Sequence, residues 1–144
     1  MREEELDRAA DLILEAARVF FSAAQGPLKD LKLGAAHYRA LAAIRRGPAG
    51  SVSVLLSQLK VRKQSLARVL NDLERAGLIV RERSTRDGRA RAVVLTAAGE
   101  AAERATSAAL RERLAEVFRV SGAEAVAGAR LVLSALAKDS EDDT

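Results

Sequence analysis

The sequence feature that most constrains the fold is the stretch 51–99, which combines two helical patterns with two strand patterns. Apolar side chains recur at helical spacing in residues 53–59 and again in residues 62–76. Residues 78–83 and 91–95 then alternate as antiparallel strands do, with turn-forming residues between them. Two short helices joined by a tight turn and followed by a β-hairpin form a winged helix-turn-helix, which we therefore predict.

The second of these helical patterns has two contrasting faces. Its apolar side chains are Leu66, Val69, Leu70 and Leu73, and its polar stripe is Gln64, Arg68, Asn71 and Arg75. Gly77 follows as the predicted stop, because glycine adopts a left-handed backbone at the lowest cost. An α-helix with such a polar stripe fits the major groove of DNA, so residues 62–76 are the candidate recognition helix.

Further helical patterns flank this stretch on both sides. We predict helices at 3–24, 35–46 and 97–120, and a last one ending near Ala137. The predicted fold is mainly α with a small antiparallel β-wing. We assign residues 1–144 to a single domain, in which 1–33 and 97–138 pair two copies, 35–96 form the winged helix-turn-helix, and 139–144 are a disordered acidic tail.

Several shorter signals predict where these elements begin and end. Gly26 and Pro27 are expected to stop the first helix before a short connection, and Thr96 is expected to cap the helix that follows the hairpin. Ser51 and Val52 are predicted as a short strand. The run 121–124, Ser-Gly-Ala-Glu, has the spacing of a capping box at the start of the last helix.

The first helix carries more apolar surface than one chain can cover. Leu6, Ala10 and Ile13 follow one another at steps of four and three, which is a heptad-like seam. Val126 and Leu133 lie on one face of the last helix. We therefore predict a homodimer, with these five residues in its interface.

Basic residues are concentrated in one segment. Residues 60–91 contain ten Lys or Arg against four Asp or Glu, whereas the formal net charge of the whole chain is +4. A confined basic patch is the footprint expected of a nucleic-acid-binding face. Charge alone leaves open the alternative of a solvated basic surface.

Other classes of function find little support in the sequence. The chain has no cysteine, which excludes disulfides and thiolate metal sites within it, and His37 is its one histidine. It shows no nucleophile–base pair, phosphate-binding loop or metal cluster, so we predict neither an enzyme nor a cofactor. No segment is apolar for long enough to span a membrane and the acidic N-terminus is unlike a secretory signal, so we expect a cytoplasmic protein.

The first turn of the recognition helix supplies the candidate contacts to bases. These residues are Arg62, Lys63, Gln64 and Ser65, with Arg68 one turn further along. Gln64 is suited to adenine and Arg68 to guanine, each through paired hydrogen bonds. Solvated polar positions on an amphipathic helix are the alternative.

The hairpin supplies a second set of candidate DNA contacts. Arg86 and Arg89 near its tip are suited to a narrow minor groove, and Asp87 is placed to hold Arg89 extended. The arginines lower on the hairpin, which are Arg81, Arg83 and Arg91, are predicted to contact phosphates. A charged, solvated hairpin is the alternative.

Three runs of residues resemble a known signature. They are Leu73-Glu-Arg-Ala-Gly77-Leu78-Ile79-Val-Arg81, Asp87-Gly-Arg89 and Leu95-Thr96-Ala-Ala-Gly99. Together they resemble MarR-type transcriptional regulators, and the runs 36–41 and 63–70 resemble the PetP-type branch of that family. The resemblance implies an obligate homodimer, with a winged helix-turn-helix flanked by terminal dimerisation helices.

The same resemblance implies roles for particular residues. Arg89 corresponds to the wing arginine that enters the minor groove, and Asp87 to its support. The branch usually has a small hydroxyl residue where Arg62 stands, so this helix lacks a cap worth roughly 1 kcal/mol. Family members often bind small aromatic acids as effectors, which makes Phe20, His37 and Tyr38 candidate ligand-binding residues. A structural role is the alternative for His37.

The leading hypothesis is therefore a homodimeric, sequence-specific regulator of transcription that binds double-stranded DNA. Its two recognition helices would enter successive major grooves about 34–36 Å apart, so the operator should be a near-palindrome. A winged-helix module that binds another protein, with weak or no DNA binding, is the alternative. The steepness of the salt dependence of duplex binding separates the two.

Overall fold

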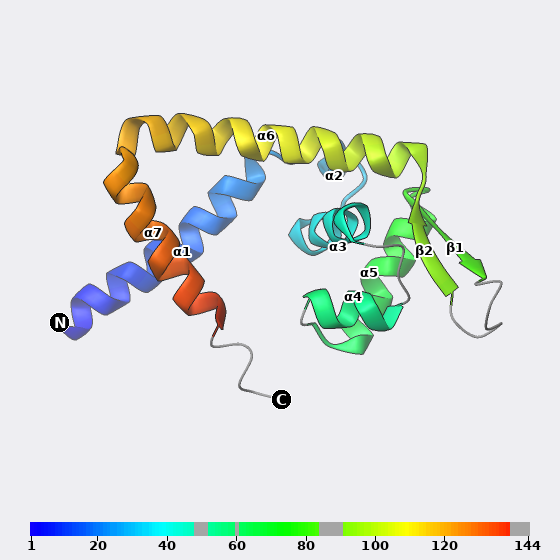
Figure 1. Ribbon diagram of the computed structural model, residues 1–144, viewed down its shortest axis with the longest axis horizontal. Helices are drawn as coiled ribbons and strands as arrows, with labels where there is room; N and C mark the ends of the chain where they lie inside the picture. Colours follow the sequence, from blue (N-terminus) through cyan, green and yellow to red (C-terminus); the bar gives the residue numbers. More distant parts are fainter. Residues whose placement is uncertain (48–51, 60, 84–90, 139–144) are drawn as a thin grey trace. The chain divides into compact units, whose positions relative to one another are not determined.

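The computed structural model describes residues 1–47, 52–59, 61–83 and 91–138 and divides the chain into two compact units, Met1–Leu110 and Arg111–Thr144. Its elements in chain order are α1 (Glu3–Ser22), α2 (Gly26–Asp30), α3 (Ala35–Arg46), α4 (Val52–Leu59), α5 (Lys63–Arg75), β1 (Ile79–Arg83), β2 (Arg91–Leu95), α6 (Ala97–Ser121) and α7 (Ala123–Lys138) (Figure 1). The predicted fold class is confirmed: the described part of the chain is mainly helical, with one small antiparallel sheet.

Most predicted boundaries agree with the structure to within two residues, and three local predictions are wrong. Val52 begins α4 and so is not part of a strand; Ser51 lies outside the described residues. The connection after α1 contains the short helix α2, and Pro27 stands in its first turn, where a missing N–H costs no hydrogen bond. Ser121 is the last residue of α6, so it does not cap α7; Gly122 separates the two helices with a φ of 87°.

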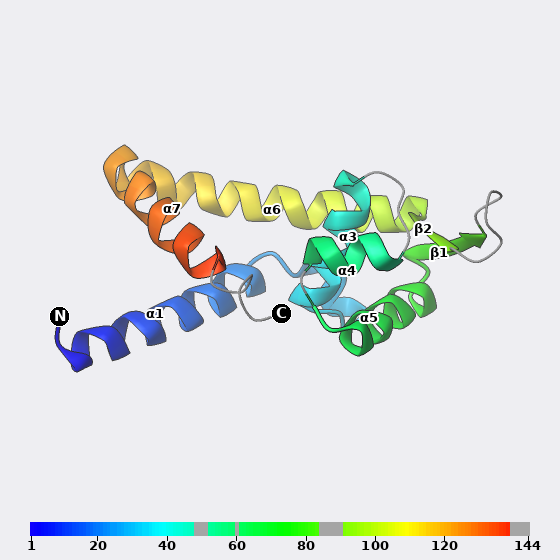
Figure 2. The same cartoon turned by 60° about the horizontal axis from the view of Figure 1, so that its bottom comes forward.

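The core of the first unit forms where the apolar faces of α3, α4 and α5 meet. Leu41 of α3, Leu55 of α4 and the α5 leucines Leu66, Leu70 and Leu73 are all buried and belong to one cluster. Each helix is amphipathic, and burying its apolar face against the other two removes that face from water. Figure 2 shows these three helices gathered beside the first half of α6.

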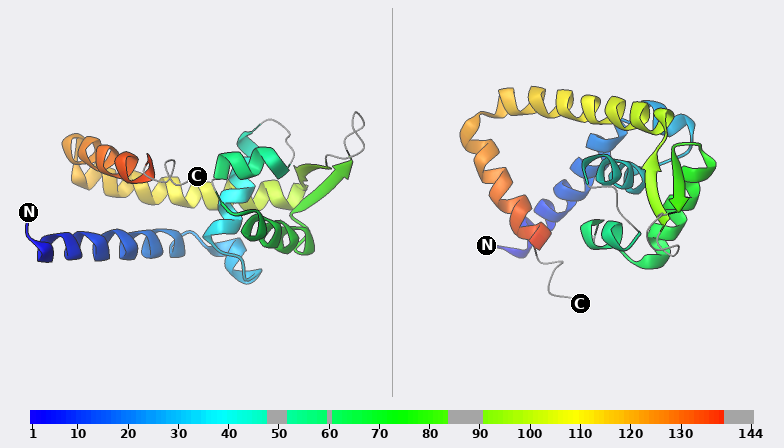
Figure 3. Two further views of the ribbon diagram at one scale, coloured as in Figure 1. Left: turned by 90° about the horizontal axis from the view of Figure 1, so that it is seen from below. Right: turned by 45° about the vertical axis from the view of Figure 1, so that its right-hand side comes forward.

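The hairpin adds a sheet edge to this core. β1 and β2 pair antiparallel, with Ile79 opposite Leu95 and Arg81 opposite Val93. Ile79 and Val93 are buried, so one face of the hairpin packs on the core while Val80, on the other face, is exposed. Figure 3 shows the hairpin beside α5.

A compact junction joins the end of α5, the start of β1 and the start of α6. Gly77 leaves α5 with a φ of 76°, as the sequence predicts for a helix stop. The Thr96 hydroxyl donates to the Gly77 carbonyl at 2.6 Å and accepts from the Gly99 N–H at 3.0 Å, while the Thr96 N–H donates to the Leu78 carbonyl at 3.0 Å. Thr96 therefore caps α6, as predicted, and also bonds the two segments together.

Gly99 permits this junction to be so tight. A Cβ atom added there would collide with the carbonyl oxygen of Leu78 and would lie 2.9 Å from its carbonyl carbon. Both atoms belong to the backbone, so no side-chain rotation relieves the collision. The spacing Leu-Thr-x-x-Gly thus has a physical reason: threonine caps the helix, and glycine admits the backbone of residue 78.

The second unit consists of the last part of α6 and α7. None of its described residues is buried within the chain, although several are large and apolar. Val120 is 90% exposed and Leu131 is 75% exposed. Such surface is unusual on helices that face water on all sides.

Replacing Gly99 by alanine should destabilise the fold by at least about 1–3 kcal/mol, the usual cost of forcing a methyl group into a packed site. Urea unfolding followed by circular dichroism measures this change. Gly26→Ala is the matched control, because a Cβ at Gly26 meets nothing within 4 Å. Equal stability of the two variants would show that the junction tolerates the extra atom.

Candidate nucleic-acid interface

One face of α5 is buried and the opposite face is free. Leu66, Leu70 and Leu73 have at most 1% of their surface exposed. The residues predicted to contact bases, which are Arg62, Lys63, Gln64, Ser65 and Arg68, are all exposed. The structure therefore places these five exposed side chains at the start and in the first two turns of α5, with Gln64 and Arg68 on the side away from the buried leucines.

Arg62 occupies the position before the first residue of α5. Its backbone is extended, with φ −70° and ψ 145°, and its side chain makes no capping hydrogen bond. The prediction that this helix lacks a side-chain cap at Arg62 is therefore confirmed. The amide groups of the first turn are left free for other acceptors, and helix N-termini favour anions.

The predicted hairpin contacts lie partly outside the described residues. Arg83 and Arg91 are opposite each other at the outer ends of β1 and β2, and their side chains are not described. Arg86, Asp87 and Arg89 lie outside the described residues. The predicted minor-groove contacts therefore stay predictions.

Arg81 is held by α5. Its Nε lies 3.0 Å from Oε2 of Glu74, and its Nη2 donates to Oδ1 of Asn71 at 2.9 Å. Its side chain is 24% exposed. The predicted phosphate contact at Arg81 thus has a competing pair of partners within the chain.

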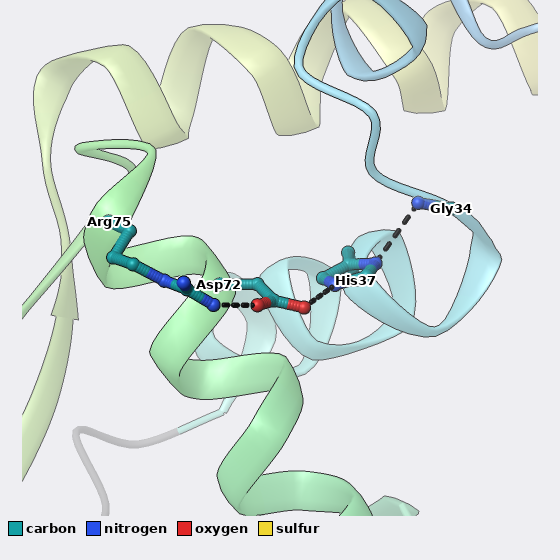
Figure 4. Close-up of polar contacts among 4 residues, drawn as sticks. All are labelled: Gly34, His37, Asp72 and Arg75. Atoms are coloured by element: carbon teal, nitrogen blue, oxygen red, sulfur yellow. Dashed lines mark hydrogen bonds and ion pairs between the residues drawn. The ribbon is translucent and has the colours of Figure 1, made fainter.

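His37 links the first turn of α3 to the last turn of α5 (Figure 4). Its Nδ1 accepts a hydrogen bond from the Gly34 N–H at 3.0 Å, and its Nε2 lies 2.9 Å from Oδ2 of Asp72. The neutral ring with its hydrogen on Nε2 satisfies both contacts. Arg75 donates to the other Asp72 oxygen at 2.6 Å, so this carboxylate is held on both sides.

These contacts change the acidity of Asp72. The hydrogen bond from His37 lowers the pKa of the Asp72 carboxyl below its ordinary value; partial burial opposes this shift, and the hydrogen bond from Arg75 adds to it. The folded state therefore favours the charged carboxylate. His37 and Asp72 together fix α5 against α3 at the C-terminal end of α5.

The next residue of α3 begins a second chain of polar contacts. The Tyr38 hydroxyl lies 2.7 Å from Oγ of Ser107, which donates to Oε1 of the fully buried Glu103 at 2.7 Å. Because the serine hydrogen is used on Glu103, the tyrosine donates to the serine. Arg45 forms an ion pair with the other Glu103 oxygen. Both ends of α3 are therefore bonded to the first part of α6.

The three residues predicted to bind an effector are in the same unit, but the structure assigns two of them internal partners. The polar side-chain atoms of His37 and Tyr38 bind Asp72 and Ser107, which agrees with a structural role for His37. Phe20 is partly buried near the end of α1. An apolar hollow bordered by Leu59, Ser65 and other side chains of α3 and α5 measures about 50 Å³. It is far smaller than the ~150 Å³ cavity that accepts benzene.

Two other features, a metal-binding cluster and a membrane-spanning helix, are absent from the described part of the chain. It contains no group of three His, Asp or Glu side chains placed to hold a metal ion. No described helix is both long and apolar enough to cross a membrane.

Three acidic residues that hold α5, the hairpin and α3 in place are not predicted from the sequence. They are Asp72, Glu74 and Glu103, and the first two stand in a basic segment, where acidic residues suggest a solvated surface. The contact of Glu74 with Arg81 had a sequence signal. Arg81 follows Ile79 by two residues in one strand, so Arg81 and the buried Ile79 lie on the same face of the hairpin, which packs on the core. The buried Glu103 has no comparable sequence signal.

Comparison with known proteins gives consistent results. A model of the MarR family matches residues 31–90. The HTH-type transcriptional regulator PetP of Rhodobacter capsulatus is 38% identical over 136 residues, which are 94% of this chain and 82% of that protein. This relative thus matches nearly the whole length of the chain.

Solved structures show the same fold. Streptococcus pneumoniae FabT in complex with DNA has a TM-score of 0.82 at 21% identity, with 99% of this chain and 100% of that chain covered. A mutant of MarR from E. coli complexed with operator DNA has a TM-score of 0.71 at 24% identity, with 92% and 95% covered.

Asp72 should make the stability of the fold depend on pH. A carboxyl whose pKa is lower in the folded state stabilises that state above its unfolded pKa of about 3.9, and the contribution is lost as the pH falls through the lower folded value. The stability difference between wild type and Asp72→Asn should therefore be largest above about pH 5 and shrink toward pH 3. Asp30→Asn, which also removes one exposed acidic charge, is the control; a difference that does not vary with pH would contradict the assignment.

Proposed function

The chain belongs to the MarR family of transcriptional regulators, and from that premise we propose that two copies of it bind one double-stranded DNA site through α5 and the β1–β2 hairpin. The exposed first turns of α5 carry this proposal. There the side chains suited to base edges stand on the face opposite the buried leucines. The buried leucines hold α5 on the core, so the opposite face of the helix stays accessible to DNA.

The charges on this face favour a polyanion. Arg62, Lys63 and Arg68 form no ion pair with any described residue, whereas Arg75 and Arg81 pair with acidic side chains of α5. When unpaired cations of the protein neutralise phosphates, the counterions condensed on the DNA are released, and this release drives binding. In this proposal Gln64 and Arg68 read bases, while Arg62, Lys63 and Ser65 contact bases or phosphates near them.

The hairpin is proposed to contact the DNA beside the recognition helix. Arg86 and Arg89 enter the minor groove, Asp87 supports Arg89, and Arg83 and Arg91 meet phosphates. This assignment rests on their positions in the sequence and on the family resemblance. The DNA complexes of FabT and MarR, which share the fold, support DNA binding as such.

Dimerisation is proposed from the apolar surface of the terminal helices. Neither α1 nor α7 has a residue buried within the chain. The apolar side chains of Leu6, Ile13 and Leu133 are 54%, 38% and 54% exposed. A second copy that covers Leu6, Ala10, Ile13, Val126 and Leu133 would remove this surface from water. Two copies related by a two-fold axis would then present two α5 helices to a near-palindromic operator.

An effector and a location complete the proposal. We propose that a small aromatic acid regulates binding at a site that includes Phe20, His37 and Tyr38, as the family resemblance implies. Such a ligand would shift the dimer between operator-binding and non-binding spacings by its preference for one of them. A regulator that binds chromosomal DNA acts in the cytoplasm, where we place this protein.

The test of DNA binding uses a duplex selected from random-sequence DNA by the wild-type protein. We expect the logarithm of the affinity to fall with the logarithm of salt concentration by about 0.9 for each phosphate neutralised, and several phosphates to be involved. Fluorescence anisotropy at four or more salt concentrations gives this slope. A flat salt dependence, or no selected duplex, would favour the protein-interaction module instead.

Arg68→Ala should relax discrimination at the base pair that Arg68 contacts, by about 1–3 kcal/mol. The measurement compares the affinity of each variant for the selected duplex and for duplexes with single base-pair changes. Arg104→Ala removes an exposed arginine of α6 and should leave the discrimination as in wild type. Uniform weakening on all duplexes would make Arg68 a phosphate contact.

Ile13→Asp and Leu133→Glu should convert the dimer into monomers, because each places a charge in an apolar interface. Sedimentation velocity at micromolar concentration measures the change. Val80→Glu is the control, since Val80 is 43% exposed but lies on the hairpin. A wild-type chain that sediments as a monomer would contradict the dimer itself.

A further inference from the structure

The pattern of the hairpin directs Arg81 toward α5. Residues directly opposite in an antiparallel pair project from the same face, and Arg81 is paired with Val93, which is 2% exposed. Two residues earlier, Ile79 is 1% exposed and shares this face. Arg81 is therefore the outermost described side chain on the face of β1 that packs against the rest of the unit.

Two contacts hold its guanidinium against one side of α5. Asn71 and Glu74 are three residues apart, so they are neighbours on the helix surface. The planar fork of Arg81 spans both of them, with Nη2 on the Asn71 oxygen at 2.9 Å and Nε 3.0 Å from the Glu74 carboxylate. The Nε atom is buried and has no hydrogen-bond partner among the described residues, so its contact with Glu74 is an ion pair and not a hydrogen bond.

This arrangement is poorly suited to a phosphate contact. The positive charge of Arg81 is balanced by Glu74, and a phosphate that approached the same fork would meet the negative carboxylate. Lys63 is better suited to a phosphate contact. Its side chain is exposed, and its charge is not balanced by an ion pair with any described residue. The two cations thus stand in different electrostatic surroundings.

We propose that Arg81 is a positioning residue, which fixes the angle between α5 and the hairpin by bridging β1 to Asn71 and Glu74. This inference rests on the proposed function, in which α5 and the hairpin contact one DNA duplex at the same time. Thr96 and Gly77 fix the root of the hairpin, and Arg81 ties it to α5 further along β1. Loss of the bridge lets the hairpin swing, so that helix and hairpin fit their grooves together less often.

The experiment compares the salt dependence of binding to the selected duplex for wild type, Arg81→Lys, Glu74→Ala and Lys63→Ala. Lysine keeps the charge but its single nitrogen cannot reproduce the fork, since arginine and lysine differ at bidentate sites. We expect Arg81→Lys to bind roughly 3- to 30-fold more weakly than wild type, with the same salt slope. Lys63→Ala, the control for a lost phosphate contact, should make the slope shallower by about one.

Glu74→Ala gives a prediction of opposite sign for the two roles. If Arg81 met a phosphate, removal of the nearby carboxylate would strengthen binding, because a repulsion disappears and the arginine is freed. If Arg81 positions the hairpin, Glu74→Ala weakens binding as Arg81→Lys does. Alanine favours an exposed helical position, so this variant is expected to fold.

Wild-type affinity for Arg81→Lys, or tighter binding by Glu74→Ala, would overturn the positioning role while leaving DNA binding intact. Absence of any salt-dependent binding by the wild-type protein would instead overturn the proposed function, and the role of Arg81 with it. Urea unfolding of each variant confirms that the compared proteins are folded.

Discussion

The close approach of α6 to the backbone of Leu78 is the constraint on which the rest of the first unit depends. Gly99 leaves room for the Leu78 carbonyl, and Thr96 bonds to both the residue before Leu78 and the helix after the hairpin. Three elements therefore meet at one point: the end of α5, the root of the hairpin and the start of α6. A larger residue at position 99 would separate them, and the hairpin would lose its fixed origin.

Polar contacts away from this junction hold the C-terminal half of α5, while Arg62, Lys63 and Arg68 near its start form no ion pair with any described residue. His37 holds Asp72 near the end of the helix, and Arg81 bridges Asn71 and Glu74. The apolar contacts of Leu66 and Leu70 hold the first turns of the helix on the core. A helix held in this way can present side chains to a ligand without losing conformational freedom on binding, because its backbone is already ordered.

The fold was largely predictable because its boundaries are marked by residues with a specific local role. Gly77 stops α5 through its left-handed backbone, and Thr96 caps α6 as its position suggests. The errors occurred where a local signal had two meanings. Pro27 predicts the end of a helix but stands in the first turn of another, and Ser121 predicts a cap but ends α6.

The candidate site was predictable within α5, but its contacts with other elements were not. The amphipathic pattern of α5 shows which residues face outward, so Gln64 and Arg68 follow from spacing alone. The bond between His37 and Asp72 joins residues 35 positions apart, and that of Tyr38 with Ser107 joins residues 69 apart. Periodicity within one element carries no information about such pairs, since they depend on how the helices pack.

In the proposed complex, α5 enters the major groove of DNA twice, once from each of two copies. Methylation protection with dimethyl sulfate detects this arrangement, because the reagent modifies guanine N7 in the major groove and adenine N3 in the minor groove. We expect two protected major-groove patches, with centres about 10 base pairs apart, on the selected duplex. A single patch, or protection confined to the minor groove, would contradict it.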